Sequence, residues 1–168
     1  MKTGVLAILA AMIAASMAVA QDSGEAPPDY EASSDGGPNL SQYTAEPQVQ
    51  TGRFLTALEV KPILGATRAN WVAVREWDGK DLVYVTHLWS WRCGLVAIRG
   101  AVNGGALEDW PLPACHDETA QPNAVLSEDG LPYLSYPLKS VETVTVEVIY
   151  DDLTTEKASF NRLGVLIP

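Results

Sequence analysis

The stretch Trp71–Leu88, with the sequence WVAVREWDGKDLVYVTHL, decides the fold of this chain. Asp78-Gly79 stands at its centre, and this dipeptide favours the two-residue turn of a β-hairpin because glycine readily adopts positive φ. The flanking residues are rich in valine, tryptophan and tyrosine, which are typical of strands. We therefore predict strands at residues 71–77 and 82–88, joined by this turn.

More strand signals follow on the C-terminal side of this hairpin. Asn103-Gly104-Gly105 is a natural three-residue hairpin loop, and Asp151-Asp152 forms a further turn. Between these turns, valine, threonine and tyrosine alternate with the period of two that is typical of a half-buried strand. The further strands predicted in this way are residues 93–101, 106–110, 133–136, 141–150 and 154–160.

One main helix is predicted ahead of the strands, from Thr56 to Asn70. Thr56 is a good N-cap, and Glu59 lies three residues further on, at the spacing of a capping box. Val60 and Leu64 recur at helical spacing and define one buried face. The sequence therefore predicts an α+β fold, in which a mostly antiparallel sheet of about five to seven strands carries one main N-terminal helix.

The first 20 residues have the organisation of a cleavable signal peptide. Lys2 supplies a positive charge, Val5–Ala15 is an apolar run, and Ala18-Val19-Ala20 is the small-x-small pattern that precedes cleavage. The run is shorter than the roughly 20 apolar residues that span a bilayer, so we predict cleavage after Ala20 and no membrane insertion afterwards. The alanine-rich leader is of the bacterial kind, which predicts a periplasmic or secreted protein.

The mature chain is predicted to contain a tail and a single domain. Residues 21–50 hold six acidic side chains, four prolines and no Lys or Arg. Such a segment buries too little apolar surface to offset its conformational entropy, which predicts a disordered acidic linker or tail. Residues 51–168 are long enough to enclose a hydrophobic core, and we predict that they form one α+β domain.

The charge balance excludes two classes of partner. The chain has 11 Lys and Arg residues against 21 Asp and Glu residues, which gives a formal net charge of −10. Nucleic acids and anionic membranes bind proteins through clustered Lys and Arg side chains. We therefore predict neither as a partner, and the acidic surface is accounted for by solubility.

Cys93 and Cys115 are predicted to form a disulfide, because an even cysteine count in a small exported domain indicates bridging. If Asn103-Gly104-Gly105 is a hairpin loop, Val102 faces Ala106, and the same register places the two cysteines opposite each other. Facing residues have Cα separations of about 4.5–5.5 Å, which a disulfide can bridge. A reactive redox pair usually has C-x-x-C spacing, which is absent here.

His87 is the candidate catalytic residue. The predicted second strand directs His87 to the same side as Trp89 and Trp91, and an imidazole in such surroundings can act as a general base. Ser90 or Ser135 would then be the nucleophile, although no G-x-S-x-G elbow presents a serine. The alternative interpretation is a hydrogen-bonded histidine at the edge of the core.

Trp89, Trp91 and Arg92 are the candidate binding residues. They fall within the run WSWRCG at residues 89–94, and tryptophan and arginine are enriched in the hot spots of protein interfaces. The alternative is that the two tryptophans fill the core and Arg92 pairs with one of the many acidic residues.

These patterns favour a non-catalytic function. The sequence contains no spacing typical of a metal site, no phosphate-binding loop and no haem motif, so we predict neither a metal nor a cofactor. The preferred hypothesis is an exported accessory subunit or protein-binding module with a protein partner in the periplasm. The alternatives are a small periplasmic hydrolase that uses His87 and a small-ligand binder on the sheet face.

Overall fold

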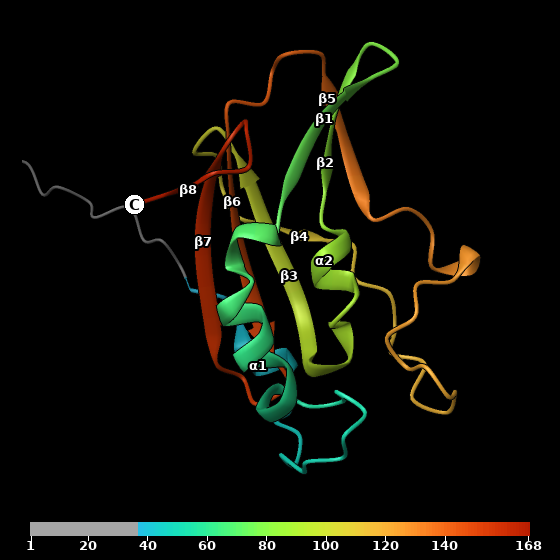
Figure 1. The fold of residues 1–168 in the computed structure, drawn as a ribbon. Helices are drawn as coiled ribbons and strands as arrows, with labels where there is room; N and C mark the ends of the chain where they lie inside the picture. Colours follow the sequence, from blue (N-terminus) through green and yellow to red (C-terminus); the bar gives the residue numbers. More distant parts are fainter. Residues whose placement is uncertain (1–36) are drawn as a thin grey trace, which may run out of the picture. The chain divides into compact units, whose positions relative to one another are not determined.

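The computed structural model describes residues 37–168, so the predicted signal peptide and residues 21–36 of the predicted tail lie outside the described residues. Residues 38–168 form one compact unit. Its strands make two antiparallel sheets, and its longest helix, α1, has ten residues (Figure 1). The prediction of a mostly antiparallel fold with few helices is confirmed, but the strands divide between two sheets instead of forming one.

The first sheet contains three strands in the order β1-β2-β5, namely β1 (Ala73–Trp77), β2 (Lys80–Tyr84) and β5 (Tyr133–Pro137). Asp78 and Gly79 form the turn between β1 and β2, with φ values of 47° and 70°. The hairpin predicted from Asp78-Gly79 is therefore confirmed. The short strand predicted at 133–136 is also confirmed, and it pairs with β2.

The prediction of a strand at residues 82–88 is wrong in its second half. β2 ends at Tyr84, and Thr86–Trp89 form a short helix, α2, in which the amide of Trp89 donates to the carbonyl of Val85 at 3.1 Å. Val85, Leu88 and Trp89 recur at helical spacing, and all three are buried. Burial of these side chains by one helical turn overrides the local alternation. The predicted arrangement, in which an extended strand directs His87, Trp89 and Trp91 to the same side, therefore does not form.

The second sheet contains five strands in the order β4-β3-β6-β7-β8, namely β3 (Leu95–Val102), β4 (Glu108–Trp110), β6 (Thr143–Tyr150), β7 (Thr155–Asn161) and β8 (Leu166–Ile167). Ile98 pairs with Trp110 and Arg99 with Asp109, which is the register predicted from the Asn103-Gly104-Gly105 loop. β8 was not predicted, because two residues carry no periodic pattern.

α1 (Ala57–Ala66) begins after Thr56, as predicted, but the predicted capping box does not form. The amide of Ala57 donates instead to the Asp151 carboxylate at 2.9 Å. The Glu59 carboxylate accepts the amides of Thr51 at 2.8 Å and Leu55 at 2.9 Å, so it folds the preceding loop onto the helix. The helix ends earlier than predicted, and a short 3-10 turn, η2 (Arg68–Asn70), follows it.

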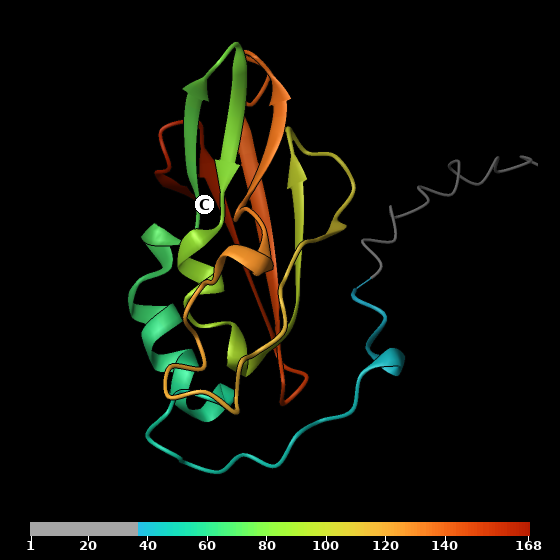
Figure 2. The same cartoon turned by 90° about the vertical axis from the view of Figure 1, so that its right-hand side faces the viewer.

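The described part of the predicted tail contacts the domain. Residues 38–50 include a 3-10 turn, η1 (Leu40–Gln42). They begin on the side of the five-stranded sheet opposite α1 and α2 and then pass beneath the domain toward α1 (Figure 2). The amide of Glu46 donates to the carbonyl of Asp151 at 2.9 Å, and Gln48 Nε2 donates to the Asp151 carboxylate at 2.8 Å. The same carboxylate therefore binds both this segment and the start of α1.

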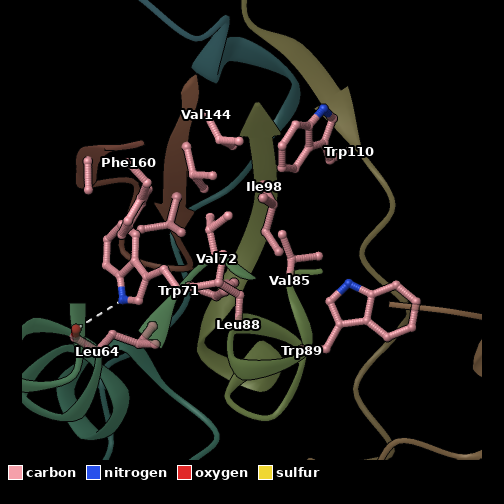
Figure 3. Packing of buried hydrophobic residues seen from close by; sticks show 14 of the residues in the cluster. Leu64, Trp71, Val72, Val85, Leu88, Trp89, Ile98, Trp110, Val144 and Phe160 are labelled. Atoms are coloured by element: carbon pink, nitrogen blue, oxygen red, sulfur yellow. Dashed lines mark hydrogen bonds between the residues drawn. The ribbon is translucent and has the colours of Figure 1, made fainter. Parts of the chain in front are cut away.

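The hydrophobic core lies between the helices and the two sheets (Figure 3). The indole of Trp71 donates to the carbonyl of Leu64 at 3.0 Å, which satisfies its only polar group inside the core. Trp110 packs directly on Gly100, where an added Cβ would lie 2.1 Å from the indole ring. Gly100 is thus required for this contact. Val144, Ile98 and Phe160 of the five-stranded sheet complete the cluster.

The predicted disulfide between Cys93 and Cys115 is confirmed, with a Cα–Cα distance of 4.8 Å. Cys93 belongs to a 3-10 turn, η3 (Arg92–Gly94), instead of a strand. β4 ends at Trp110, because the following Pro111 has no amide hydrogen for the ladder. The disulfide therefore lies beyond the last hydrogen-bonded pair of β3 and β4. It holds the irregular segment 111–132 against the domain.

Removal of the disulfide is expected to lower the free energy of unfolding by about 3 kcal/mol, because the bridge closes a loop between residues 22 positions apart and restricts the unfolded chain. The measurement is urea unfolding of the native protein and of the double variant Cys93→Ser/Cys115→Ser. Equal unfolding midpoints, or two free thiols in denatured but unreduced protein, would refute the role given to the bridge.

Candidate functional site

Two of the three predicted binding residues lie inside the protein. Trp89 is 2 % exposed and Arg92 is 1 % exposed. The Trp89 indole donates to the carbonyl of Pro111 at 2.8 Å, and its ring belongs to the core (Figure 3). In this structure neither side chain offers a surface to a partner.

The Arg92 guanidinium organises the segment 111–132. It donates to the carbonyl oxygens of Ala114, Asn123 and Ala124 at 2.8–2.9 Å, and it also pairs with the buried Asp129 carboxylate at 3.3 Å. Burial acts to raise the pKa of Asp129, but the Leu126 amide and the Arg92 charge outweigh it and hold that pKa below its usual value. Arg92 is thus a structural side chain that fixes a long loop.

Trp91 is the half-buried member of the predicted trio. Its ring meets Phe54 edge-on, with ring centroids 5.3 Å apart. Phe54 has a φ of 58°, which is strained for a bulky side chain, and its carbonyl accepts a hydrogen bond from Asn123 at 3.0 Å. Together with Pro122, these rings border an open groove of about 370 Å³.

His87 lies on α2 and bonds to a threonine. Its Nε2 is 2.7 Å from Thr67 Oγ1, and that hydroxyl donates to the carbonyl of Ile63 at 2.6 Å. The Thr67 hydrogen is therefore used, so the imidazole Nε2 carries a hydrogen and donates to Thr67. Burial lowers the pKa of His87, which favours the neutral ring.

The structure does not bring the candidate serines into a pair with His87. Ser90 Oγ donates to the carbonyl of Thr86 at 3.0 Å, and Ser135 lies on an exposed position of β5. A serine nucleophile needs a base within hydrogen-bonding reach. Within residues 37–168, no hydrogen bond joins either serine to His87.

His87 nevertheless borders a hollow with a volume of about 510 Å³. We call this hollow the His87 pocket. Its walls come from η2, β1, β2 and α2. Its lining consists of Asn70, Ala73, Arg75, Tyr84, Thr86, His87 and Ser90.

Arg75 is the unusual member of this lining. Its guanidinium makes no hydrogen bond and no ion pair within residues 37–168. The other arginines in the same part of the chain all donate to carboxylate or carbonyl oxygens, and these are Arg53, Arg68, Arg92, Arg99 and Arg162. An unpaired cation in a chain with a net charge of −10 stands out, because acidic partners are plentiful.

The pocket continues onto an exposed face of the three-stranded sheet. Alternate residues of a strand point to opposite faces, and Val74, Val83 and Leu134 pack against the core. The opposite face, which we call the outer sheet face, is therefore formed by Ala73, Arg75, Trp77, Lys80, Leu82, Tyr84, Tyr133, Ser135 and Pro137.

The outer sheet face combines aromatic rings with positive charge. Trp77 is 73 % exposed, and the rings of Tyr84 and Tyr133 lie against each other with centroids 5.0 Å apart. Arg75 and Lys80 are its charged residues, and the face contains neither aspartate nor glutamate. In Figure 2 the three strands rise above α1 and α2, so the hairpin that carries Trp77 projects from the rest of the unit.

Sequence reasoning missed this face, although the signal was present. The Asp78-Gly79 hairpin places Arg75 and Trp77 on one side of β1, and their cross-strand neighbours are Leu82 and Lys80. The WSWRCG run is conspicuous in the sequence because its aromatic and basic residues are adjacent. Its residues are largely buried, whereas the exposed set is assembled from three strands.

Within residues 37–168, no group of three or more His, Cys, Asp or Glu side chains could hold a metal ion. None of the helices in that part of the chain is both long and apolar enough to cross a membrane. Comparisons with protein-family models, with curated proteins and with solved structures found no match to this chain.

Proposed function

We propose that the mature chain is an exported, non-catalytic protein-binding module that takes its protein partner on the outer sheet face. The observation that carries this proposal is Trp77, whose large apolar side chain is 73 % exposed between unpaired cations. Leaving such a ring in water is unfavourable by roughly 1.5–3 kcal/mol relative to burial, which a partner would recover.

The composition of the face supports a protein partner. Trp, Tyr and Arg are the residues enriched in interface hot spots, and the outer sheet face carries Trp77, Tyr84, Tyr133 and Arg75. Cores of interfaces are depleted in Asp and Glu, and this face has none although the chain is acidic. The face also lies on paired strands, which hold its side chains in place before binding.

The charges indicate the chemistry of the partner. Arg75 and Lys80 present two positive charges next to the aromatic rings, and neither forms an ion pair within the described residues. An acidic patch on the partner would complement these two charges. The rest of this acidic chain would repel the same patch, so the charges favour one orientation of the bound partner. This proposal moves the partner surface from Trp89, Trp91 and Arg92 to the outer sheet face.

The setting of the proposal is an oxidising compartment outside the cytoplasm. The Cys93–Cys115 disulfide is of the kind that persists in such compartments. The signal-peptide pattern of residues 1–20, with cleavage after Ala20, fits the same setting, and the periplasm remains our proposed location.

Replacing Trp77 with alanine is expected to weaken partner binding by about 30-fold, which corresponds to roughly 2 kcal/mol for a hot-spot tryptophan. The tagged mature protein is cross-linked mildly in its native compartment and purified, and the partner that accompanies it is identified. Its affinity is then measured for the native protein and for Trp77→Ala.

Leu163→Ala is the matched control, because Leu163 is another large apolar side chain, 84 % exposed, that lies outside the outer sheet face. The proposal expects Leu163→Ala to bind like the native protein. If both variants bind equally well, or if Leu163→Ala is the weaker one, the outer sheet face is not the partner surface.

A further inference from the structure

We infer that the His87 pocket is a binding site for an oxyanion group, a carboxylate or a phosphate, carried by a small organic molecule or by a partner. That a partner can supply this group rests on the function proposed above. Binding of the free anion to the pocket does not depend on that function.

The Arg75 guanidinium is the first reason. A guanidinium presents a planar fork of N–H donors that matches the two oxygens of a carboxylate or a phosphate. Within residues 37–168, Arg75 has no oxygen partner, whereas each of the other arginines there donates to a carboxylate or a carbonyl. Its fork is therefore available to a ligand.

The remaining lining supplies further donors and no competing acid. Asn70, Thr86 and Tyr84 contribute an amide and two hydroxyl groups, and no aspartate or glutamate lines the pocket. Carboxylates in the wall would repel an anion and would themselves pair with the guanidinium. Their absence is notable in a chain with 21 acidic residues.

His87 adds a titratable group whose pKa depends on the charge of a bound ligand. The titratable side chains that line the pocket with it are Arg75 from β1 and Tyr84 from β2. The neutral ring already donates from Nε2 to Thr67, so a proton gained at Nδ1 adds a positive charge at the pocket wall. An anion next to this wall favours the protonated ring, so binding should raise the pKa of His87.

The size of the pocket indicates more than a bare ion. A volume of about 510 Å³ lies within the range of about 300–1,000 Å³ that is typical of sites for organic ligands. The pocket also opens beside Tyr84 and Arg75, which belong to the outer sheet face. A carboxylate or phosphate can therefore occupy the pocket while the group that carries it extends along the sheet.

The test is an NMR titration of the mature protein at low ionic strength with two probes, succinate and inorganic phosphate. We expect saturable shifts of the His87 ring and the Arg75 Nε–H with at least one probe, together with a rise in the pKa of His87. Arg75→Gln should weaken binding at least tenfold. Lys139→Gln removes a cation that does not line the pocket and should leave binding unchanged.

The outcomes separate the possibilities. Saturation by succinate alone assigns the site to carboxylates, and saturation by phosphate alone assigns it to phosphate esters. No saturable shift with either probe up to 50 mM, or equal affinity in Arg75→Gln, would overturn the inference. If anions bind the pocket while Trp77→Ala keeps its partner, the proposed function fails and the pocket assignment stands.

Discussion

Replacing Arg92 with alanine is expected to lower the free energy of unfolding by about 4 kcal/mol, within the range for breaking a buried ion pair by removing one partner. The variant leaves the buried Asp129 carboxylate without its guanidinium, although His116 remains bonded to it at 2.9 Å. It also leaves the carbonyls of Ala114, Asn123 and Ala124 without their donors inside the protein.

The effect of Arg92→Ala should be concentrated in the segment 111–132, which Arg92 binds at several points. Hydrogen exchange is expected to show faster exchange of amides in that segment, and urea unfolding gives the free energy. Arg75→Ala is the control, because an arginine without a protein partner should change stability by less than about 0.5 kcal/mol. Equal losses in the two variants would contradict the structural role of Arg92.

Replacing Asp81 with alanine is expected to lower the melting temperature by roughly 10–15 °C. The Asp81 side chain is fully buried and accepts two hydrogen bonds from Arg162, at 2.6 and 2.8 Å. It also accepts the amides of Lys139 and Val141, each at 3.0 Å. One carboxylate therefore joins β2 to the β5–β6 connection and to the end of β7. Alanine would leave the amides of Lys139 and Val141 without their acceptor, and Arg162 would keep only Glu76 and the carbonyl of Val141.

The Asp81 interaction also predicts acid sensitivity. Hydrogen bonding to Arg162 holds the pKa of Asp81 well below its usual value of about 3.9. A lowered pKa in the folded state stabilises the protein above the unfolded value, and this stability is lost as the pH falls through the folded value. Asp81→Asn should therefore show a shallower loss of stability below about pH 4 in urea titrations.

Glu76→Ala is the control for Asp81, because Glu76 is a second, solvent-exposed partner of Arg162 at 2.7 Å. Exposed ion pairs contribute about 0–1 kcal/mol, so this variant should melt within a few degrees of the native protein. Comparable melting temperatures for Asp81→Ala and Glu76→Ala would show that the buried position of Asp81 does not matter.

Much of the fold follows from turns that can be recognised in the sequence. Asp78-Gly79 and Asn103-Gly104-Gly105 fix two hairpins and their registers, because short loops allow few pairings. The second register then places Cys93 near Cys115, and the disulfide is found there. These features depend on local chemistry, so one sequence is sufficient to predict them.

Features that depend on tertiary packing were not predictable in the same way. The sequence of Val85 to Trp89 is compatible with both a strand and a helical turn. The helical turn forms because it buries Leu88 and Trp89. Apart from the carbonyl of Trp89, the oxygen partners of Arg92 lie 22 to 37 positions away in the sequence, so its burial could not be predicted from the local sequence. The division of the strands into two sheets likewise depends on which strands meet at long range.

The candidate site was missed because its residues come from separated strands. Arg75 and Trp77 gain significance from being unpaired and exposed, and sequence alone shows neither property. By contrast, Trp89 and Arg92 form a conspicuous local run, and both belong to the interior. Exposure, and not residue type, separates the two sets.

Site-specific photo-cross-linking in the native compartment tests the partner surface most directly. A photoreactive phenylalanine analogue is placed at Ser135, on the outer sheet face, and in a second protein at the exposed Thr154, in the turn between β6 and β7. Our account predicts one dominant protein adduct from position 135 and none from position 154. An adduct from position 154 with none from position 135 would contradict it.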